Sequence, residues 1–190
     1  MRFISNNIIE IDRELSDLDL FTLDFVKILR KYTDYVIVSG YVSILLGRAR
    51  SSEDVDIIIP RLNSIKFMQL LKGIKESDFY CLNSEDDNDI YDYLNDNIAV
   101  RFAKNKVVIP NMELKFAKNN VDELTLNKTI KVKLGNDEII ISNLELQIAF
   151  KEAVLKSPKD IEDARHIRAV AEGHLDIGLI EKYEAMLDDF

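Results

Sequence analysis

The stretch "VIVSGYVSILLGRARSSEDVDIII", Val36–Ile59, decides the fold. It begins and ends with β-branched runs, and such runs predict buried strands. Gly40 breaks the first run, and "YVSILLG" after it predicts a short helix that ends at Gly47. The polar segment "RARSSE" leads into the second run, which Pro60 stops. The stretch therefore predicts two strands of one sheet, joined by a glycine turn, a short helix and a polar loop.

Two carboxylates interrupt the second apolar run. Residues i and i+2 of a strand point to the same face, so Asp54 and Asp56 project together while Val55 and Ile57 point into the core. The carboxylates would stand roughly 6–7 Å apart and repel each other. A cation between them removes that cost, and Mg²⁺ prefers hard oxygen ligands of this kind. The alternative is a strand start whose two acids lie in water, each paired with a surface lysine.

The segment between the strands suits a phosphate chain. Backbone N–H groups at the start of a helix can receive a phosphate, and the helix after Gly40 offers such a start. Arg48 and Arg50 follow that helix, and Ser51 and Ser52 stand just before the two acids. Each part has a role in holding a triphosphate together with its metal ion.

Val36–Ile59 resembles the signature of the polymerase-β-like nucleotidyltransferase superfamily, in which a glycine turn precedes a D-x-D strand. The series Arg48 to Asp56 is most similar to minimal nucleotidyltransferases of bacteria and archaea, including the AbiEii-like group. The resemblance implies an α+β fold with a mixed sheet flanked by helices. It also implies Mg²⁺, with Mn²⁺ as the alternative, at Asp54 and Asp56. The nucleotide-binding residues that it implies are Ser39, Gly40, Ser43, Arg48, Arg50, Ser52 and Lys115.

The chain departs from the family pattern directly after the turn. Members commonly have Gly-Ser or Gly-Gly there, whereas Tyr41 follows Gly40 here. A hydroxyl after the glycine would contact a phosphate, so we expect Ser39 or Ser43 to supply it.

Glu113 is the candidate for a third carboxylate. "NMELKFA" alternates with period two, which is typical of a half-exposed strand, and it places Glu113 and Lys115 on the polar face. The resemblance implies that Glu113 completes the metal site or deprotonates the attacking hydroxyl. The alternative is an exposed glutamate paired with Lys115 or Lys131.

The C-terminal part reads as helices. Ser142 and Glu145 have capping-box spacing, Ser157 with Pro158 predicts a second helix start, and Asp176 predicts a third. The change of pattern predicts a nucleotidyltransferase-like α/β core at 1–141 and a helical segment at 142–190 packed on it.

"LQIAFKEAVLKSPKDIEDARHI" resembles the lysine and K-D-x-x-D segments that follow the catalytic domain in the AbiEii-like group. By that resemblance Lys151 faces the nucleotide phosphates, and Asp160 or Asp163 orients it or acts as a base. The alternatives are a solvated lysine and, for Asp160, an acid favoured by the dipole of its helix.

Composition limits the function classes. The chain has 190 residues and a net charge of −9, which argues against a protein that coats DNA. A single cysteine, Cys81, fits a reducing, cytoplasmic setting. The N-terminal residues show no signal peptide, and no apolar run approaches the ~20 residues of a membrane helix. Seven lysines could still guide an acceptor: Lys104, Lys106, Lys115, Lys118, Lys128, Lys131 and Lys133.

The first functional hypothesis is an enzyme that moves a nucleoside monophosphate from an NTP to a hydroxyl of RNA, protein or a small molecule, with release of pyrophosphate. The second is a catalytically weak relative that binds or regulates a protein partner, such as a toxin–antitoxin component. The third is an α+β domain without an active site. The sequence leaves the acceptor and the NTP open.

Overall fold

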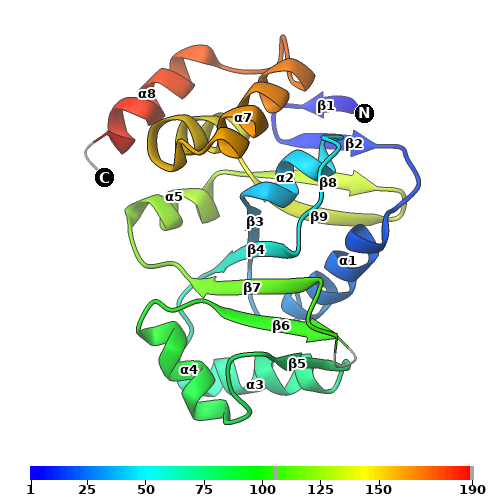
Figure 1. Cartoon of the computed structure of the whole chain (residues 1–190), viewed down its shortest axis with the longest axis vertical. Coiled ribbons are helices and arrows are strands. Elements are labelled where there is room, and N and C mark those ends of the chain that lie inside the picture. The colour runs from blue at the N-terminus through cyan, green and yellow to red at the C-terminus, as the bar shows by residue number, and fades with distance from the viewer. Residues whose placement is uncertain (105–106, 189–190) are drawn as a thin grey trace.

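Within the described residues, 1–104 and 107–188, the computed structural model has nine strands in one mixed sheet (Figure 1). The strand order is β1-β2-β8-β9-β3-β4-β7-β6-β5. The strands are β1 (Arg2–Ser5), β2 (Ile8–Ile11), β3 (Val36–Val38), β4 (Asp54–Ile59), β5 (Phe79–Cys81), β6 (Val100–Lys104), β7 (Asn111–Phe116), β8 (Thr129–Leu134) and β9 (Asp137–Ser142).

Helices flank this sheet and lie beyond its two ends (Figure 1). They are α1 (Asp17–Leu29), α2 (Gly40–Leu45), α3 (Ser64–Lys75), α4 (Asp87–Asn95), α5 (Asn120–Asn127), α6 (Leu144–Phe150), α7 (Pro158–Val170) and α8 (Ile177–Leu187). A π-helical turn, η1 (Lys151–Leu155), extends α6. The predicted α+β class, a mixed sheet flanked by helices, is therefore confirmed.

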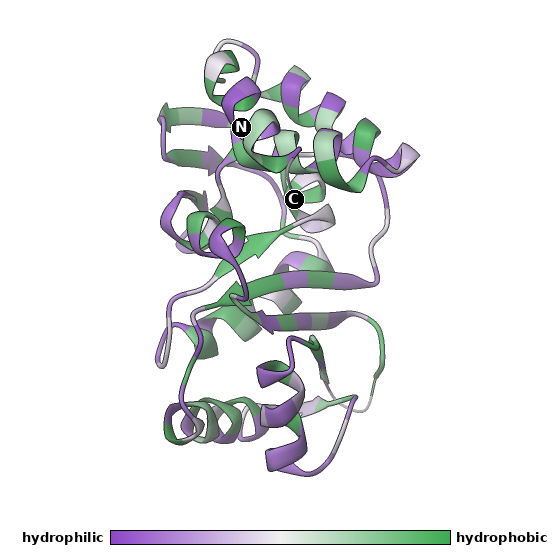
Figure 2. Cartoon of the chain, turned by 90° about the vertical axis from the view of Figure 1, so that its left-hand side faces the viewer, coloured by the Kyte–Doolittle hydropathy of each residue, from purple (hydrophilic) through white to green (hydrophobic). Residues whose placement is uncertain are grey.

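The middle of the sheet separates two apolar clusters. Val55 and Ile57 of β4 are fully buried in the main core, where Phe25 of α1 and Phe67 of α3 also lie. On the other face a small cluster of Val36, Val38 and Ile58 packs against Leu126 of α5. Figure 2 shows the alternation of polar and apolar residues as purple and green bands along β7 and β6. Asp54 and Asp56 share this second face of β4 with Ile58, so the carboxylates lie beside the small cluster and on the opposite side of the sheet from the main core.

Side-chain caps set where the helices begin. Helix α1 begins at Asp17, because Ser16 and Asp19 form a capping box, and the Thr22 hydroxyl donates to the Leu18 carbonyl within the helix. Helix α6 is capped by Asn143 rather than Ser142, since the Asn143 side chain accepts the Leu146 N–H. The predicted caps of α7 and α8, Ser157 and Asp176, are confirmed.

The sequence pattern did not predict the β1–β2 hairpin or helix α5, which joins β7 to β8. The division into 1–141 and 142–190 stays a prediction. In the part of the chain that the structure describes, no helix has the length and apolar character needed to cross a membrane.

Candidate functional site

Asp54 and Asp56 lie on one face of β4, as the strand period requires. Val55 between them is fully buried, whereas both aspartates are half-buried. Strand β4 pairs with β3 on one side and β7 on the other, and Asp56 stands opposite Val38 and Glu113 respectively. The pair therefore lies in the middle of the sheet, where neighbouring strands can add further side chains.

The surroundings of Asp56 disfavour its ionised form. Burial, together with the negative charges of Glu113 and Asp54, raises the pKa of Asp56 to about 6. A hydrogen bond with Ser39 and the charge of Lys115 oppose this rise in pKa without cancelling it. The Ser52 hydroxyl donates to the Asp54 carboxylate over 3.3 Å. A bound cation would relieve the repulsion that holds the pKa of Asp56 high.

Glu113 is held by an arginine that the sequence pattern did not single out. Arg101 Nε and Nη2 both donate to Glu113 Oε2, over 2.9 and 2.8 Å. Arg101 is opposite Glu113 in the antiparallel β6–β7 pair, so the two side chains leave the same face of the sheet. Among the described residues, no three histidine, cysteine, aspartate or glutamate side chains are arranged to hold a metal ion together. Glu113 would have to turn from Arg101 to join the aspartates.

The glycine turn lies at the carboxyl end of β3. Ser39 has φ 62° and ψ −134°, a conformation that costs a non-glycine residue free energy and that recurs at functional sites. Gly40 then begins α2. A Cβ atom on Gly40 would collide with the guanidinium of Arg50. The guanidinium therefore occupies the space that a side chain at residue 40 would need. Glycine is needed here for close approach.

Tyr41 points away from the site. Its ring is fully buried, and its hydroxyl donates to Asp19 Oδ1 over 2.8 Å. Asp19 is also bound by Arg13 and by the Ser16 cap of α1. Tyr41 therefore ties the turn to α1 and does not replace a phosphate-binding hydroxyl. Ser43 is fully buried as well, and its hydroxyl finds no partner among the described residues.

A buried ionic network fixes the two arginines after α2. Asp163 of α7 is fully buried and binds Arg48, Arg50 Nη1 at 3.3 Å and Lys151 Nζ at 2.9 Å. Burial favours the neutral carboxyl, but the hydrogen bonds from Lys151 and Arg48 outweigh it and lower the pKa of Asp163. Asp163 therefore stays ionised and joins α7 to the loop after α2.

Lys151 does not face the cleft as the resemblance implies. Its side chain is 1% exposed and lies between Asp163 and Asp160, whose Oδ1 is 3.3 Å from Nζ. Lys151 begins the π-helical turn η1, a rare distortion that is frequent at functional sites. In this conformation Asp163 binds Arg48 and Arg50, and Lys151 binds Asp163 on the side away from the cavity.

A cavity of about 250 Å³ lies over the paired aspartates. Its lining combines the turn, the polar loop, β4 and the start of α7, and comprises Ser39, Gly40, Arg50, Ser52, Asp54, Asp56, Leu155, Lys159 and Asp160. Lys159 forms no ion pair with any described residue, and the buried Nε of Arg50 has no hydrogen-bond partner among them. The lining thus contains the two β4 carboxylates, the cationic side chains of Arg50 and Lys159, and a third carboxylate, Asp160, next to Lys159 on α7.

The structure brings about half of the sequence candidates to this cavity, namely Ser39, Gly40, Arg50, Ser52, Asp54, Asp56 and Asp160. Glu113 is opposite Asp56 on β7 but does not line the cavity, and Lys115, two residues further on, is paired with Asp122 at 3.5 Å. Ser43, Lys151 and Asp163 lie behind it. Arg101 was not predicted, because an arginine in a strand carries no spacing signal. Lys159 is the lysine of the K-D-x-x-D segment, but the resemblance assigned the phosphate role to Lys151.

The predicted lysine-rich acceptor path is partly neutralised. Lys104 binds Asp24 at 2.6 Å and Lys131 binds Glu138 at 3.1 Å, in addition to the Lys115 pair. Lys106 lies outside the described residues. Lys118, Lys128 and Lys133 form no ion pair with a described residue, and the acceptor path stays a prediction.

The donor set of the cavity fits a divalent magnesium ion. Mg²⁺ is usually held by one or two carboxylates and by phosphate oxygens, and Asp54 with Asp56 supplies the carboxylates. Burial and the charges of Glu113 and Asp54 raise the pKa of Asp56, and a cation bound beside it would lower that pKa.

The sheet and its flanking helices have a nucleotidyltransferase-like fold. The crystal structure of an antigenic nucleotidyltransferase-like protein from Paracoccidioides brasiliensis matches 92% of this chain and 89% of that chain, with 18% sequence identity and a TM-score of 0.54. JHP933 from Helicobacter pylori matches 87% of this chain and 72% of that chain, with 19% identity and a TM-score of 0.49. No family model and no curated protein matches the sequence. The AbiEii-like subgroup stays a prediction.

Proposed function

We propose that the protein is a cytoplasmic nucleotidyltransferase that moves a nucleoside monophosphate from an NTP to a hydroxyl acceptor. The observation that carries the proposal is the pair Asp54 and Asp56 on one strand face. The glycine turn at Gly40 and the cationic side chains of Arg50 and Lys159 line the same cavity. Asp54 and Asp56 would hold Mg²⁺, with Mn²⁺ as the alternative. The bound ion would supply positive charge against the transferring phosphoryl group and the leaving group.

Other residues at the site bind the phosphates and accept the proton. Arg50, braced by Asp163, and Lys159 bind the β- and γ-phosphates, and the backbone at Gly40 approaches them closely. The acceptor oxygen forms a bond to the α-phosphorus while the bond from that phosphorus to the bridging oxygen breaks, and pyrophosphate leaves. The acceptor proton passes to Glu113, which first turns from Arg101.

A second candidate function rests on the same Arg101–Glu113 contact. If Arg101 holds Glu113 permanently, the site lacks a third carboxylate and a proton acceptor. The protein would then bind nucleotides weakly or regulate a protein partner, as in a toxin–antitoxin pair.

An assay of label transfer from NTP to an acceptor distinguishes the enzyme from the binding or regulatory protein. The protein is incubated with labelled NTPs, Mg²⁺ and total RNA, cell protein or small hydroxyl acceptors. Wild type should transfer label, and Asp54→Asn/Asp56→Asn should lose transfer by about 100-fold or more, as expected when groups that stabilise the transition state are removed. The control Asp12→Asn/Asp34→Asn makes the same charge change at exposed positions and should stay active. Equal transfer by wild type and the site variant, with every acceptor class, would rule out the enzyme.

A further inference from the structure

A second cavity, of about 60 Å³, adjoins the phosphate side of the site. The two cavities share Ser39 and Leu155 in their linings. The second one follows the same sheet face further along β4, past Ile58, toward helices α5 and α6. The cleft therefore continues beyond the paired aspartates as a narrow pocket.

The chemistry of this pocket differs from that of the phosphate side. Its walls are mainly apolar and include Val38, Ile58 and Phe150. Lys115 and Asp122 form an ion pair at 3.5 Å within its lining. The pocket therefore joins a charged corner to an apolar slot, which does not suit a further phosphate.

Two buried polar side chains give the slot a hydrogen-bonding edge. Gln147 is 7% exposed, and its Nε2 donates to Ser142 Oγ over 2.5 Å, which leaves the amide oxygen available as an acceptor. Thr125 is 6% exposed and donates its hydroxyl to the Val121 carbonyl, so its oxygen can accept a further bond. Fixed amide and hydroxyl groups in an apolar slot are the usual means of reading a planar heteroaromatic ligand.

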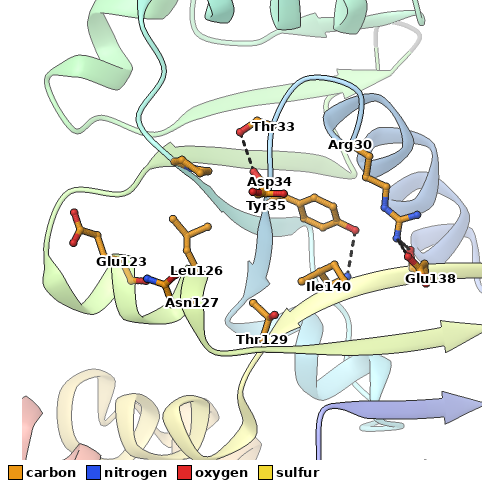
Figure 3. Close-up of a pocket in the computed structure, with 11 residues that line it drawn as sticks. Arg30, Thr33, Asp34, Tyr35, Glu123, Leu126, Asn127, Thr129, Glu138 and Ile140 are labelled. Carbon is orange, nitrogen blue, oxygen red and sulfur yellow. Dashed lines mark hydrogen bonds and ion pairs between the residues drawn. The ribbon is translucent and has the colours of Figure 1, made fainter.

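A larger cavity offers a contrast. It has about 560 Å³ and lies at the opposite end of β3 (Figure 3). Helix α5 contributes residues to the linings of both cavities. Asp34, Glu123 and Glu138 line it, and its Arg30 already donates to Glu138. Figure 3 shows Glu123 and Asn127 on one wall and Tyr35 facing Ile140 on the other. An acidic cavity away from the paired aspartates would repel a triphosphate, whereas the small pocket continues their cleft.

We propose that the small pocket binds the nucleobase edge of the NTP and so determines nucleotide preference. This inference rests on the proposed function, since it requires phosphates over Asp54 and Asp56. A volume of about 60 Å³ accommodates the edge of a ring and not a whole nucleoside. The ribose would then lie beside Lys115, between the two cavities.

The test compares ligands with and without a base. Dissociation constants in Mg²⁺ are measured for inorganic tripolyphosphate and for ATP, GTP, CTP and UTP, with wild type, Gln147→Leu and Thr125→Leu. Wild type should bind at least one NTP more tightly than tripolyphosphate. Gln147→Leu should weaken that NTP by about fivefold, the effect of one lost hydrogen bond, with tripolyphosphate unchanged. Thr125→Leu fills part of the slot and should act likewise. The control Thr129→Leu makes the same change at the larger cavity and should alter neither ligand.

The outcomes are separable. The inference is overturned if wild type binds every NTP no better than tripolyphosphate, or if both slot variants keep the wild-type ratio between the two ligands. A wild-type protein that binds neither NTP nor tripolyphosphate would instead overturn the proposed function. Unchanged tripolyphosphate binding in each variant shows that the variant has folded.

Discussion

Asp56 shows how one residue links the stability of the sheet to the site. A carboxylate on a solvated strand edge would be ionised well below neutral pH, but Asp56 lies between β3 and β7 with Asp54 and Glu113 close by. Its pKa of about 6 means that the folded protein disfavours the charge that a metal site needs. Such a conflict is typical of a functional position, because folding alone would favour an apolar residue there.

Asp56→Asn should stabilise the metal-free protein at high pH. A folded pKa raised above the ordinary value gives a contribution that is complete below about pH 4 and is lost as pH rises through about 6. At pH 8 in EDTA we expect the unfolding free energy of the variant to exceed that of wild type by about 3 kcal/mol, and this gain should fall close to zero by about pH 3.5. Urea unfolding at both pH values measures it. Asp12→Asn, at an exposed position, is the control, and a gain independent of pH would contradict the assignment.

Gly40 contributes to the site by leaving space for the Arg50 guanidinium. Gly40→Ala keeps an acceptable helical backbone but pushes the Arg50 guanidinium aside. We expect tripolyphosphate affinity to fall by about 10-fold, the loss of one charge-assisted contact, with a change in unfolding free energy below about 1 kcal/mol. Titration calorimetry and urea unfolding measure the two effects. Gly178→Ala in α8, where a Cβ meets only an ordinary contact, should leave tripolyphosphate affinity unchanged and should raise the unfolding free energy by about 1 kcal/mol or less.

At the scale of elements, the buried hydroxyl of Tyr41 connects α2, and with it the turn after β3, to α1. Tyr41 on α2 reaches Asp19, which also closes the capping box of α1. The turn at Ser39 and Gly40 is thereby held between a central strand and a second helix, so its strained backbone does not depend on the ligand. The residue that departs from the family pattern therefore has a structural purpose.

Tyr41→Phe removes that hydroxyl and keeps the ring. Asp19 retains Arg13 and Ser16 as partners, so the loss is one hydrogen bond to a charged group, and we expect the unfolding free energy to fall by about 1.5–3 kcal/mol. Urea unfolding at pH 7 provides the measurement. Tyr93→Phe is the matched control, since Tyr93 is a half-buried tyrosine on α4, and it should lower the unfolding free energy by less than Tyr41→Phe does. A loss of stability equal to that of the control would show that the Asp19 contact is unimportant.

At the scale of the whole molecule, local pattern predicted the site strand and the long helices well. "DVDIII" and "NMELKF" became β4 and β7 because alternation fixes which side chains share a face. The parallel pairing that sets Asp56 opposite Glu113, however, joins residues far apart in the chain, and no local pattern specifies it. The same holds for Arg101, for the Tyr41–Asp19 bond and for Lys151, whose burial depends on two later aspartates.

The Asp163 network gives the prediction that spans the molecule, because it joins η1, α7 and the loop after α2. Asp163→Asn leaves Lys151 buried beside two arginines with less compensating charge, so it should destabilise the protein by about 3 kcal/mol or more. Lys151→Met should cost less, since Asp163 keeps both arginines.

The pH dependence of that loss identifies its origin. The lowered pKa of Asp163 gives stability that is present above its ordinary pKa and is lost as pH falls through the lower folded value. The difference between wild type and Asp163→Asn should therefore be full at pH 7 and shrink progressively below about pH 4. Urea unfolding across this range measures it, with Glu172→Gln, at an exposed position just after the same helix, as the control. A difference that stays constant into acid would mean that Asp163 acts through packing and not through its charge.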